Sequence, residues 1–430
     1  MSPLLVVLIV FLVLFALRVP VAFVLIASSL VGIVLAPTHI GLSTLPTTMW
    51  QGINHFVLLA IPFFILMGDL ALASGVTQRL VNLAKAFVGH IAGGLAHVGV
   101  ISNIIMAGMT GSDLADAAAT GKLLIPAMGR SGYPLGYGAA LIGGAAMIGP
   151  LVPPSIAFII FAAATDTSVG RLFLGGAIPG LLLGMFLMVQ AYVTARRQGF
   201  PREPRMPYRQ RIVATVVGLP VLLIPVVVLG SILSGIATPT EAAVVGVLAV
   251  VVIGGVIYRE LTVASFARQI LATSRTVGAV FLIIVGAVVF GRMLTLYGAA
   301  DSLASYLKSV TTNPLVFLGI TNVVYLVLGC TLEVVPILLV LVPVLMPTVR
   351  ALGIDPVHFG VMTVFNLLIG LITPPSGLTM YLLCRIAGIS LQEFWRYMWP
   401  IFLTMLFALV LITVFPELCT WLPNKFMPAD

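Results

Sequence analysis

The chain has 430 residues, of which 60% are hydrophobic and only 8% are charged, and its formal net charge is +8. Soluble domains carry about a quarter charged residues, so this composition excludes a soluble globular protein and indicates an integral membrane protein with many helices. The basic excess is no nucleic-acid signal, because the Lys and Arg residues lie in loops between apolar runs. The three cysteines, Cys330, Cys384 and Cys419, follow no spacing motif, which argues against a disulfide framework and against a metal site.

The first half of the chain, residues 1–195, is predicted to form five membrane spans and one re-entrant hairpin. A span needs about 20 apolar residues, and residues 1–90 hold three apolar runs that we assign to membrane spans. The first run lacks a basic leader region and a clear cleavage site, so we interpret it as a retained span rather than a removed signal peptide. The charged and apolar residues of 77–87 recur at helical spacing, which predicts an amphipathic helix along the membrane interface. The three apolar runs are 3–17, 20–36 and 51–73.

The next two apolar segments are interrupted near their centres. The segment 93–128 is broken at Gly108-Met109-Thr110-Gly111-Ser112-Asp113, and arms of about half a membrane each predict a re-entrant hairpin. The segment 134–165 is broken at Gly149-Pro150-Leu151-Val152-Pro153-Pro154-Ser155. A proline removes a backbone donor and clashes with the carbonyl four residues back, and carbonyls freed at membrane depth must be buried in protein or line a wet cavity. Residues 93–165 are therefore predicted to form a hairpin followed by a broken span.

A span at 170–195 completes the first half, and residues 196–211 form the one strongly hydrophilic loop. The loop carries six arginines against the single acid Glu203, and its three prolines keep it extended, so we interpret it as the linker between the halves. If the linker is cytoplasmic, most of the other Lys and Arg residues also fall on the cytoplasmic side. This distribution fits the positive-inside rule with both termini external. The basic residues left on the outside are Arg171, Lys308, Arg350 and Lys425.

The second half, residues 212–430, repeats this order. Pro153-Pro154-Ser155 recurs as Pro374-Pro375-Ser376 at an offset of 221 residues. A pair of Gly/Pro-interrupted apolar segments at matching positions in two halves is the best sequence pointer to a transporter binding site. Because each half has an odd number of spans, the two repeats are predicted to be inverted relative to each other. The segments are the spans 212–233, 240–258 and 276–297 and the amphipathic stretch Asp301–Val310 within 212–310, the hairpin 314–349 and broken span 357–387 within 314–387, and the last span 397–415.

The two hairpin tips and the two double-proline breaks are the candidate binding sites. Each tip is expected to meet its neighbouring break near the midplane, where freed carbonyls and hydroxyls offer hard oxygen ligands that suit Na⁺, and helix N-termini suit an anionic solute group. The alternative, that these Pro and Gly residues only kink packed helices, suits one isolated break better than four in symmetric pairs. The first predicted Na⁺ site comprises Thr110, Gly111, Ser112, Asp113, Gly149, Pro150, Pro153 and Ser155. The second comprises Gly329, Thr331, Glu333, Gly370, Thr373, Pro374 and Ser376. The candidate solute contacts are Ser112, Asp113, Asp116, Pro154 and Pro375.

Ionisable residues inside the apolar segments are functional candidates by default. Asp113 and Asp116 follow the first hairpin tip, where either one could instead cap the second arm, and Glu333 lies at the second tip. Lys122 is interpreted mainly as a side chain that snorkels to the cytoplasmic face, and Asp69 as an anchor or a subunit contact. The sequence has no His-Glu-x-x-His motif and no complete phosphate-binding loop, so no enzymatic activity is expected.

Three motifs in combination resemble the large membrane subunit, the DctM-like or M subunit, of tripartite ATP-independent periplasmic (TRAP) transporters. The resemblance covers essentially the whole chain. It implies a Na⁺-driven importer of carboxylated solutes, such as C4-dicarboxylates and sialic acids, as a multi-pass protein of a bacterial inner membrane. The motifs are Gly111-Ser112-Asp113-Leu114-Ala115-Asp116-Ala117-Ala118-Ala119-Thr120-Gly121, Gly149-Pro150-Leu151-Val152-Pro153-Pro154-Ser155 and Thr373-Pro374-Pro375-Ser376-Gly377.

The resemblance also implies partners and a mechanism. The partners would be a small four-helix membrane subunit (Q) and a periplasmic solute-binding protein (P), and the family's fold suggests an elevator of the ion-transporter-superfamily type. The hairpins and broken spans would then move against a scaffold formed by the early spans of each half and the amphipathic helices, within residues 1–90 and 212–310. By motif match, Ser112 and the first break would contribute to one Na⁺ site, and the second tip with Thr373–Ser376 to the other. A non-transporting membrane assembly or receptor component is the alternative from another class.

Overall fold

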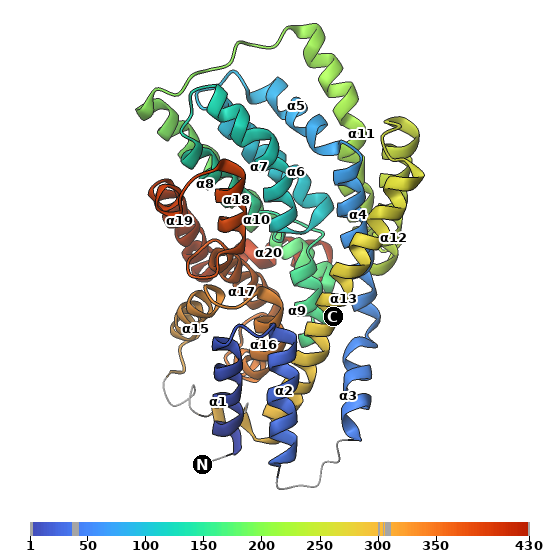
Figure 1. Cartoon of the computed structure of the whole chain (residues 1–430), viewed down its shortest axis with the longest axis vertical. Coiled ribbons are helices and arrows are strands. Elements are labelled where there is room, and N and C mark those ends of the chain that lie inside the picture. Colours follow the sequence, from blue (N-terminus) through green and yellow to red (C-terminus); the bar gives the residue numbers. More distant parts are fainter. Residues whose placement is uncertain (1–2, 37–42, 300–301, 304, 306–310, 429–430) are drawn as a thin grey trace.

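The computed structural model describes residues 3–36, 43–299, 302–303, 305 and 311–428 (Figure 1). The described residues form helices joined by turns and irregular segments, with no strand among them, which confirms the predicted all-α class. Seven of the described helices are long and apolar enough to cross a membrane, which makes the chain a multi-pass membrane protein. These seven are Phe56–Ala73, Val169–Gln198, Tyr208–Leu233, Pro239–Ile257, Val263–Leu296, Val334–Ala351 and Leu391–Val414.

The helices before the first hairpin differ from the predicted scaffold in their lengths. α1 and α2 have 14 residues each, fewer than the about 20 that a straight span needs. The predicted span 51–73 is wrong at its start, because Asn54 and the extended residue His55 separate α3 from the apolar helix that follows. α5 covers the predicted amphipathic stretch, and it packs on α6 and α11. The helices are α1 (Pro3–Ala16), α2 (Val21–Val34), α3 (Thr44–Ile53), the 3₁₀ turn η1 (Phe56–Leu59), α4 (Ala60–Ala73) and α5 (Val76–Val88).

The helix is broken at both of the places predicted in 93–165. α6 and α7 are separated by Gly111 and Ser112, and α8 and α9 by the nonhelical residues 147–155. The arms α6 and α7 have 17 and 18 residues, about 25 Å at 1.5 Å per residue, so the expected half-membrane arm length is wrong. α8 and α9, with 12 and 10 residues, are true half-length helices. The helices are α6 (Gly94–Thr110), α7 (Asp113–Arg130), α8 (Leu135–Ala146), α9 (Ile156–Thr165) and α10 (Val169–Gln198).

The nonhelical linker is shorter than predicted, since α10 and α11 extend into the segment 196–211 and leave residues 199–207 between them. α13 begins well before the predicted span 276–297, and α20 was not predicted. The stretch Asp301–Val310 lies largely outside the described residues. The helices are α11 (Tyr208–Leu233), α12 (Pro239–Val251), the π-helical turn η2 (Val252–Ile257), α13 (Val263–Leu296), α15 (Pro314–Gly329), α16 (Val334–Ala351), α17 (Pro356–Leu371), α18 (Leu378–Ala387), α19 (Leu391–Val414) and α20 (Glu417–Phe426).

Helices far apart in the sequence pack together around the breaks. α7 packs on α8 and α18, and α8 packs on α19, so the first hairpin lies beside the last part of the chain (Figure 1). On the other side, α4 packs on α6, α12 and α13, and α13 also contacts α2, α3 and α16. The helices thus form two groups, α4 with α11–α13 on one side and the hairpins with the broken helices that follow them on the other, and the breaks belong to the second group.

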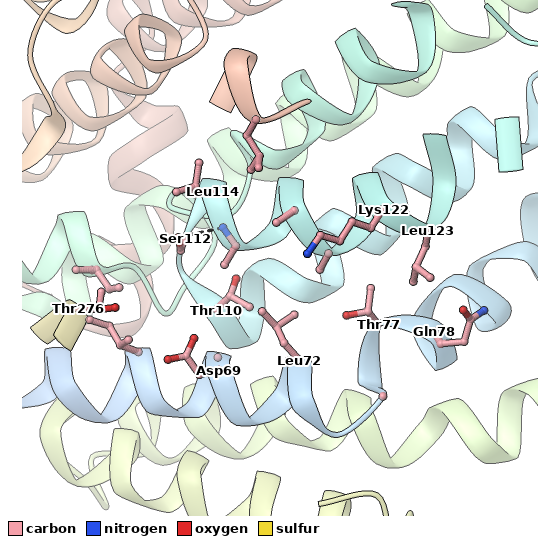
Figure 2. Close-up of a pocket in the computed structure, with 18 of the residues that line it drawn as sticks. Asp69, Leu72, Thr77, Gln78, Thr110, Ser112, Leu114, Lys122, Leu123 and Thr276 are labelled. Carbon is pink, nitrogen blue, oxygen red and sulfur yellow. Dashed lines mark hydrogen bonds between the residues drawn. The ribbon is translucent and has the colours of Figure 1, made fainter. Parts of the chain in front are cut away.

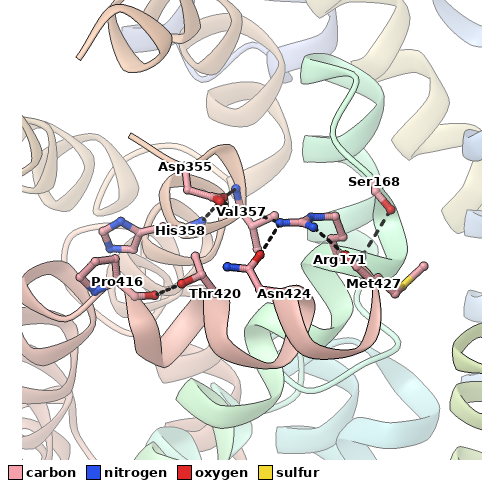
Figure 3. Close-up of polar contacts among 9 residues, drawn as sticks. All are labelled: Ser168, Arg171, Asp355, Val357, His358, Pro416, Thr420, Asn424 and Met427. Carbon is pink, nitrogen blue, oxygen red and sulfur yellow. Dashed lines mark hydrogen bonds and ion pairs between the residues drawn. The ribbon is translucent and has the colours of Figure 1, made fainter. Parts of the chain in front are cut away.

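Arg171 at the start of α10 joins this helix to the C-terminal helix α20 (Figure 3). Its guanidinium donates to the carbonyl oxygen of Met427 at 2.6 Å and to Oδ1 of Asn424 at 2.8 Å. It also lies 3.9 Å from Oδ2 of Asp355, whose other oxygen accepts from the amide of Val357 at 2.7 Å and thereby caps α17. One cation thus connects α10, at the end of the first half, with α17 and α20 of the second half.

Candidate functional site

The tip of the first hairpin lies directly against the first double-proline break. Gly111 has φ +58°, and a Cβ at this position would lie 2.5 Å from the carbonyl oxygen of Pro154, so only glycine fits the contact. Ser112 then caps α7 by accepting from the amide of Ala115 at 3.4 Å. Ser155 caps α9 in the same way, accepting from the amide of Phe158 at 3.3 Å. Tip and break therefore present two helix N-termini side by side, each with partial positive charge.

Asp116 is fully buried behind this tip. Its Oδ1 accepts from the Thr110 hydroxyl at 2.6 Å, while its Oδ2 has no hydrogen-bond partner in the described part of the chain. A Cβ on Gly149 would lie 2.6 Å from that Oδ2, so the free oxygen faces the backbone of the break. Buried polar atoms are almost always satisfied. This carboxylate oxygen, buried beside irregular backbone, is therefore the exceptional polar atom of the site.

The capping role considered for Asp113 and Asp116 is wrong, because Ser112 takes the N-cap position of α7. The two acids lie in the first turn, where their charge complements the helix dipole. Oδ2 of Asp113 accepts from the Thr379 hydroxyl at 2.6 Å, and Thr379 belongs to α18, after the second break. Sequence reasoning missed Thr379.

Asn103 and Thr120 are a second pair that the sequence did not single out. Both are fully buried, and the amide of Asn103 donates to Oγ1 of Thr120 at 3.3 Å. The Thr120 hydroxyl also lies 2.7 Å from the carbonyl oxygen of Asp116, to which it donates. These contacts tie α6 to α7 behind the tip and hold the turn that carries Asp116.

The second tip also meets its break, but through different atoms. The backbones of Gly329 and Gly370 are in direct contact, and a Cβ on Gly370 would overlap Gly329. The carbonyl oxygen of Cys330 accepts from Ser376 twice, from its amide at 3.0 Å and from its hydroxyl at 2.6 Å. The hydroxyls of Thr331 and Thr373 donate to carbonyl oxygens of the preceding helices, α15 and α17, at 2.9 and 2.6 Å. The hydroxyl protons of Thr331, Thr373 and Ser376 are thus all engaged by backbone carbonyls, and the predicted ion site at this tip stays a prediction.

Glu333 lies apart from the Thr373–Ser376 segment. It is exposed, makes no side-chain cap for α16, and lines a cavity of about 300 Å³ together with Asp113, Pro150 and Thr379. This cavity lies between the two hairpin tips, so the structure groups Glu333 with the first tip. Pro374 and Pro375 are exposed, and Pro375 is not among the described residues that line this cavity or the larger one below.

A larger cavity of about 860 Å³ adjoins the first tip (Figure 2). Asp69 of α4 and Thr77 of α5 line one wall, and Ser112 and Lys122 line the other. Both cavities share Ser112, so they meet at the tip. Asp69, interpreted from sequence as an anchor, has Oδ2 2.6 Å from the donating Thr273 hydroxyl of α13 and lines the cavity.

Paired backbone breaks between two groups of helices are typical of secondary transporters. The chain belongs to the family described as "Tripartite ATP-independent periplasmic transporter, DctM component", whose pattern matches residues 8–418. This confirms the resemblance drawn from the motifs, and the chain is a large permease subunit of the TRAP type rather than an enzyme.

Two relatives and one solved structure illustrate the similarity. The chain is 39% identical over 408 residues to the sialic acid TRAP transporter large permease protein SiaM of Vibrio cholerae, covering 95% of both chains. It is 38% identical over 381 residues to the C4-dicarboxylate TRAP transporter large permease protein DctM of Pseudomonas aeruginosa, covering 89% of both. The YdaH transporter of Alcanivorax borkumensis matches with a TM-score of 0.64 at 15% identity, covering 95% of this chain and 98% of that one. The last comparison shows the fold alone.

Proposed function

We propose that this permease subunit imports a carboxylated organic solute together with Na⁺ across a bacterial inner membrane. The observation that carries the proposal is the free Oδ2 of Asp116, buried against Gly149 at the first break. A carboxylate oxygen, the Thr110 hydroxyl and nearby backbone carbonyls are the hard ligands that a small cation prefers. The first Na⁺ site would form here, and the second around Gly329, Thr373 and Ser376.

The solute would bind where the two cavities meet. Ser112 lines both of them, and the N-termini of α7 and α9 next to it favour a carboxylate group. Asp113 and Asp116 alone would repel such a group. Bound Na⁺ would neutralise them, and this requirement would couple the solute to the ion. The relatives named above carry sialic acid or C4-dicarboxylates in their names, and the solute class proposed here is the one that they share.

The proposed movement is that of an elevator. The hairpins and broken helices would move as a unit against α4, α5 and α11–α13, within two inverted repeats. Two observations support this division: the larger cavity separates α4 from α7, and α7 packs on α18 from the other half. The proposed partners are a small four-helix membrane subunit and a periplasmic protein that delivers the solute. The third proposed partner is the lipid bilayer that surrounds the chain.

The test is uptake into vesicles that contain this chain with both partners, with sialic acid and succinate as probes. Uptake is expected to require an inward Na⁺ gradient and to cease when K⁺ replaces Na⁺. Uptake that is unaffected by removing Na⁺ would reject the coupling. The variants Ser112→Ala and Thr373→Ala distinguish a transporter from a non-transporting assembly component. Loss of uptake with intact assembly supports transport, whereas no effect of either variant supports the alternative.

A further inference from the structure

One cation faces the larger cavity. Lys122 is exposed, and its side chain extends from α7 into the space between α7 and α4 (Figure 2). Among the described residues that line this cavity, Lys122 is the one Lys or Arg, and Asp69 on the opposite wall is the one acid. The ion pairs found in the described ranges do not include Lys122. Charged residues in membrane segments that face a wet cavity mark solute or ion pathways.

The lining residues of α7 form a continuous stripe that begins at the hairpin tip. They recur at intervals of three and four, the spacing of one helix face. Ser112 precedes this face, and Lys122 stands ten residues further on, about 15 Å along the axis. The residues between them on this face are mostly alanines, whose side chains offer no competing polar group. These lining residues are Leu114, Ala115, Ala118, Ala119, Lys122 and Leu123.

We propose that Lys122 forms an anion-binding step on the inner part of the transport path, where its ammonium holds the solute carboxylate after this group leaves the first hairpin tip. The inference rests on the proposed function. Once Na⁺ has left, the carboxylates of Asp113 and Asp116 repel the anionic solute. The ammonium then supplies the next favourable position, on the side where the basic residues of α5 and the linker lie. Arginine would serve this role, and glutamine would not.

The first test measures the electrostatic potential of the cavity without a solute. In a variant free of the three native cysteines, Ala118→Cys is labelled with an anionic and a cationic methanethiosulfonate of similar size. Lys122→Gln is expected to lower the rate ratio of anionic to cationic reagent about tenfold, since a cleft with low-dielectric walls concentrates the field of its charges. Lys122→Arg should keep the ratio. The matched control is Arg130→Gln, in the last turn of the same helix and outside this cavity, which should leave the ratio unchanged.

The second test measures transport from each side of the membrane. In vesicles with both partners, Lys122→Gln is expected to raise the apparent KM for succinate or sialic acid at the inner face about fivefold, as for a partly exposed ion pair. The KM at the outer face is the internal reference. An unchanged reagent ratio overturns the proposal, and so does a changed ratio with an unchanged inner KM. Wild-type uptake that ignores Na⁺ counts against the proposed function instead, and the reagent ratio still reports on Lys122 by itself.

Discussion

The two double-proline breaks share a sequence but differ in burial. Both contain a cis peptide bond between their prolines, yet Pro153-Pro154-Ser155 is buried, whereas Pro374 and Pro375 are exposed and Ser376 is half-buried. The matching serines also act differently, because Ser155 caps α9, whereas Ser376 donates to the carbonyl oxygen of Cys330 at the neighbouring second hairpin tip.

The neighbours of each tip explain this difference. The first tip is covered by α4, where Gly68 lies against Thr110, and by α11, where Pro225 lies against Gly108. The second tip contacts its own break through Gly329 and Gly370. The motif therefore determines where a helix stops, and the helices packed around the stop determine whether the freed polar atoms are buried, hydrated or engaged.

The largest expected difference concerns two acids, Asp116 buried at the first break and Glu333 exposed at the cavity between the two hairpin tips. Asp116→Asn keeps the shape of the side chain but replaces the carboxylate by a neutral amide. We expect Na⁺-driven uptake to fall about 30- to 100-fold, the factor for losing one contact to a charged group. Glu333→Gln, on an exposed side chain, should change uptake only about threefold. Uptake rates in vesicles, with folding checked by size-exclusion chromatography, measure both. Equal losses would contradict the comparison.

The glycines that match across the breaks should separate folding from transport. A Cβ on Gly370 meets the backbone of Gly329, which cannot rotate away, so Gly370→Ala should destabilise the protein by about 1–3 kcal/mol. A Cβ on Gly149 would lie nearest to Oδ2 of Asp116, at 2.6 Å, and no backbone atom would lie closer than the Ala146 carbonyl oxygen at 3.1 Å. Gly149→Ala should therefore fold, with a displaced Asp116 side chain, and lose uptake.

Gly319→Ala in α15 is the control for these two variants, because its Cβ would meet nothing within 4 Å. Thermal unfolding in detergent measures the stability of the three variants, and Gly370→Ala is expected to be the least stable. A Gly370→Ala protein that is as stable as Gly319→Ala would show that the second tip and break do not pack as described.

The smallest expected effect concerns the two serines. Ser155→Ala removes a buried helix cap and should lower the free energy of unfolding by about 1 kcal/mol. Ser376→Ala leaves the amide bond to the Cys330 carbonyl in place and should cost only about 0.5 kcal/mol. Denaturant or thermal unfolding of both variants measures the difference, and a larger effect of Ser376→Ala would reverse the assignment of the buried site.

The sequence located the breaks because proline and glycine act locally. Two adjacent prolines remove two successive backbone donors, and both double prolines lie outside helices, whereas single prolines such as Pro225 lie within them. The lengths of the helices were harder to predict from the sequence. α13 starts at Val263 because Thr262 caps it, but its first turns carry Arg268 and Arg275, which a hydropathy criterion excludes from a span, so the predicted span began too late.

The side-chain contacts of the site were the hardest feature to predict from the sequence. Thr379 meets Asp113 across 266 positions of the chain, and only the packing of α7 on α18 brings the two together. Lys122 and Asp69 share a cavity for the same reason. α20 was missed because Pro423 and its charged ends hide the helical pattern, although Arg171 holds this helix in place.

The bond between Asp113 and Thr379 also bears on the history of the molecule. The position that corresponds to Thr379 in the first half, 221 residues earlier, is Phe158, which has no hydroxyl to offer. Two copies of either half, joined as a symmetric dimer, would therefore lack this pair. If a gene duplication produced the chain, the copies have since become unequal and can no longer replace each other.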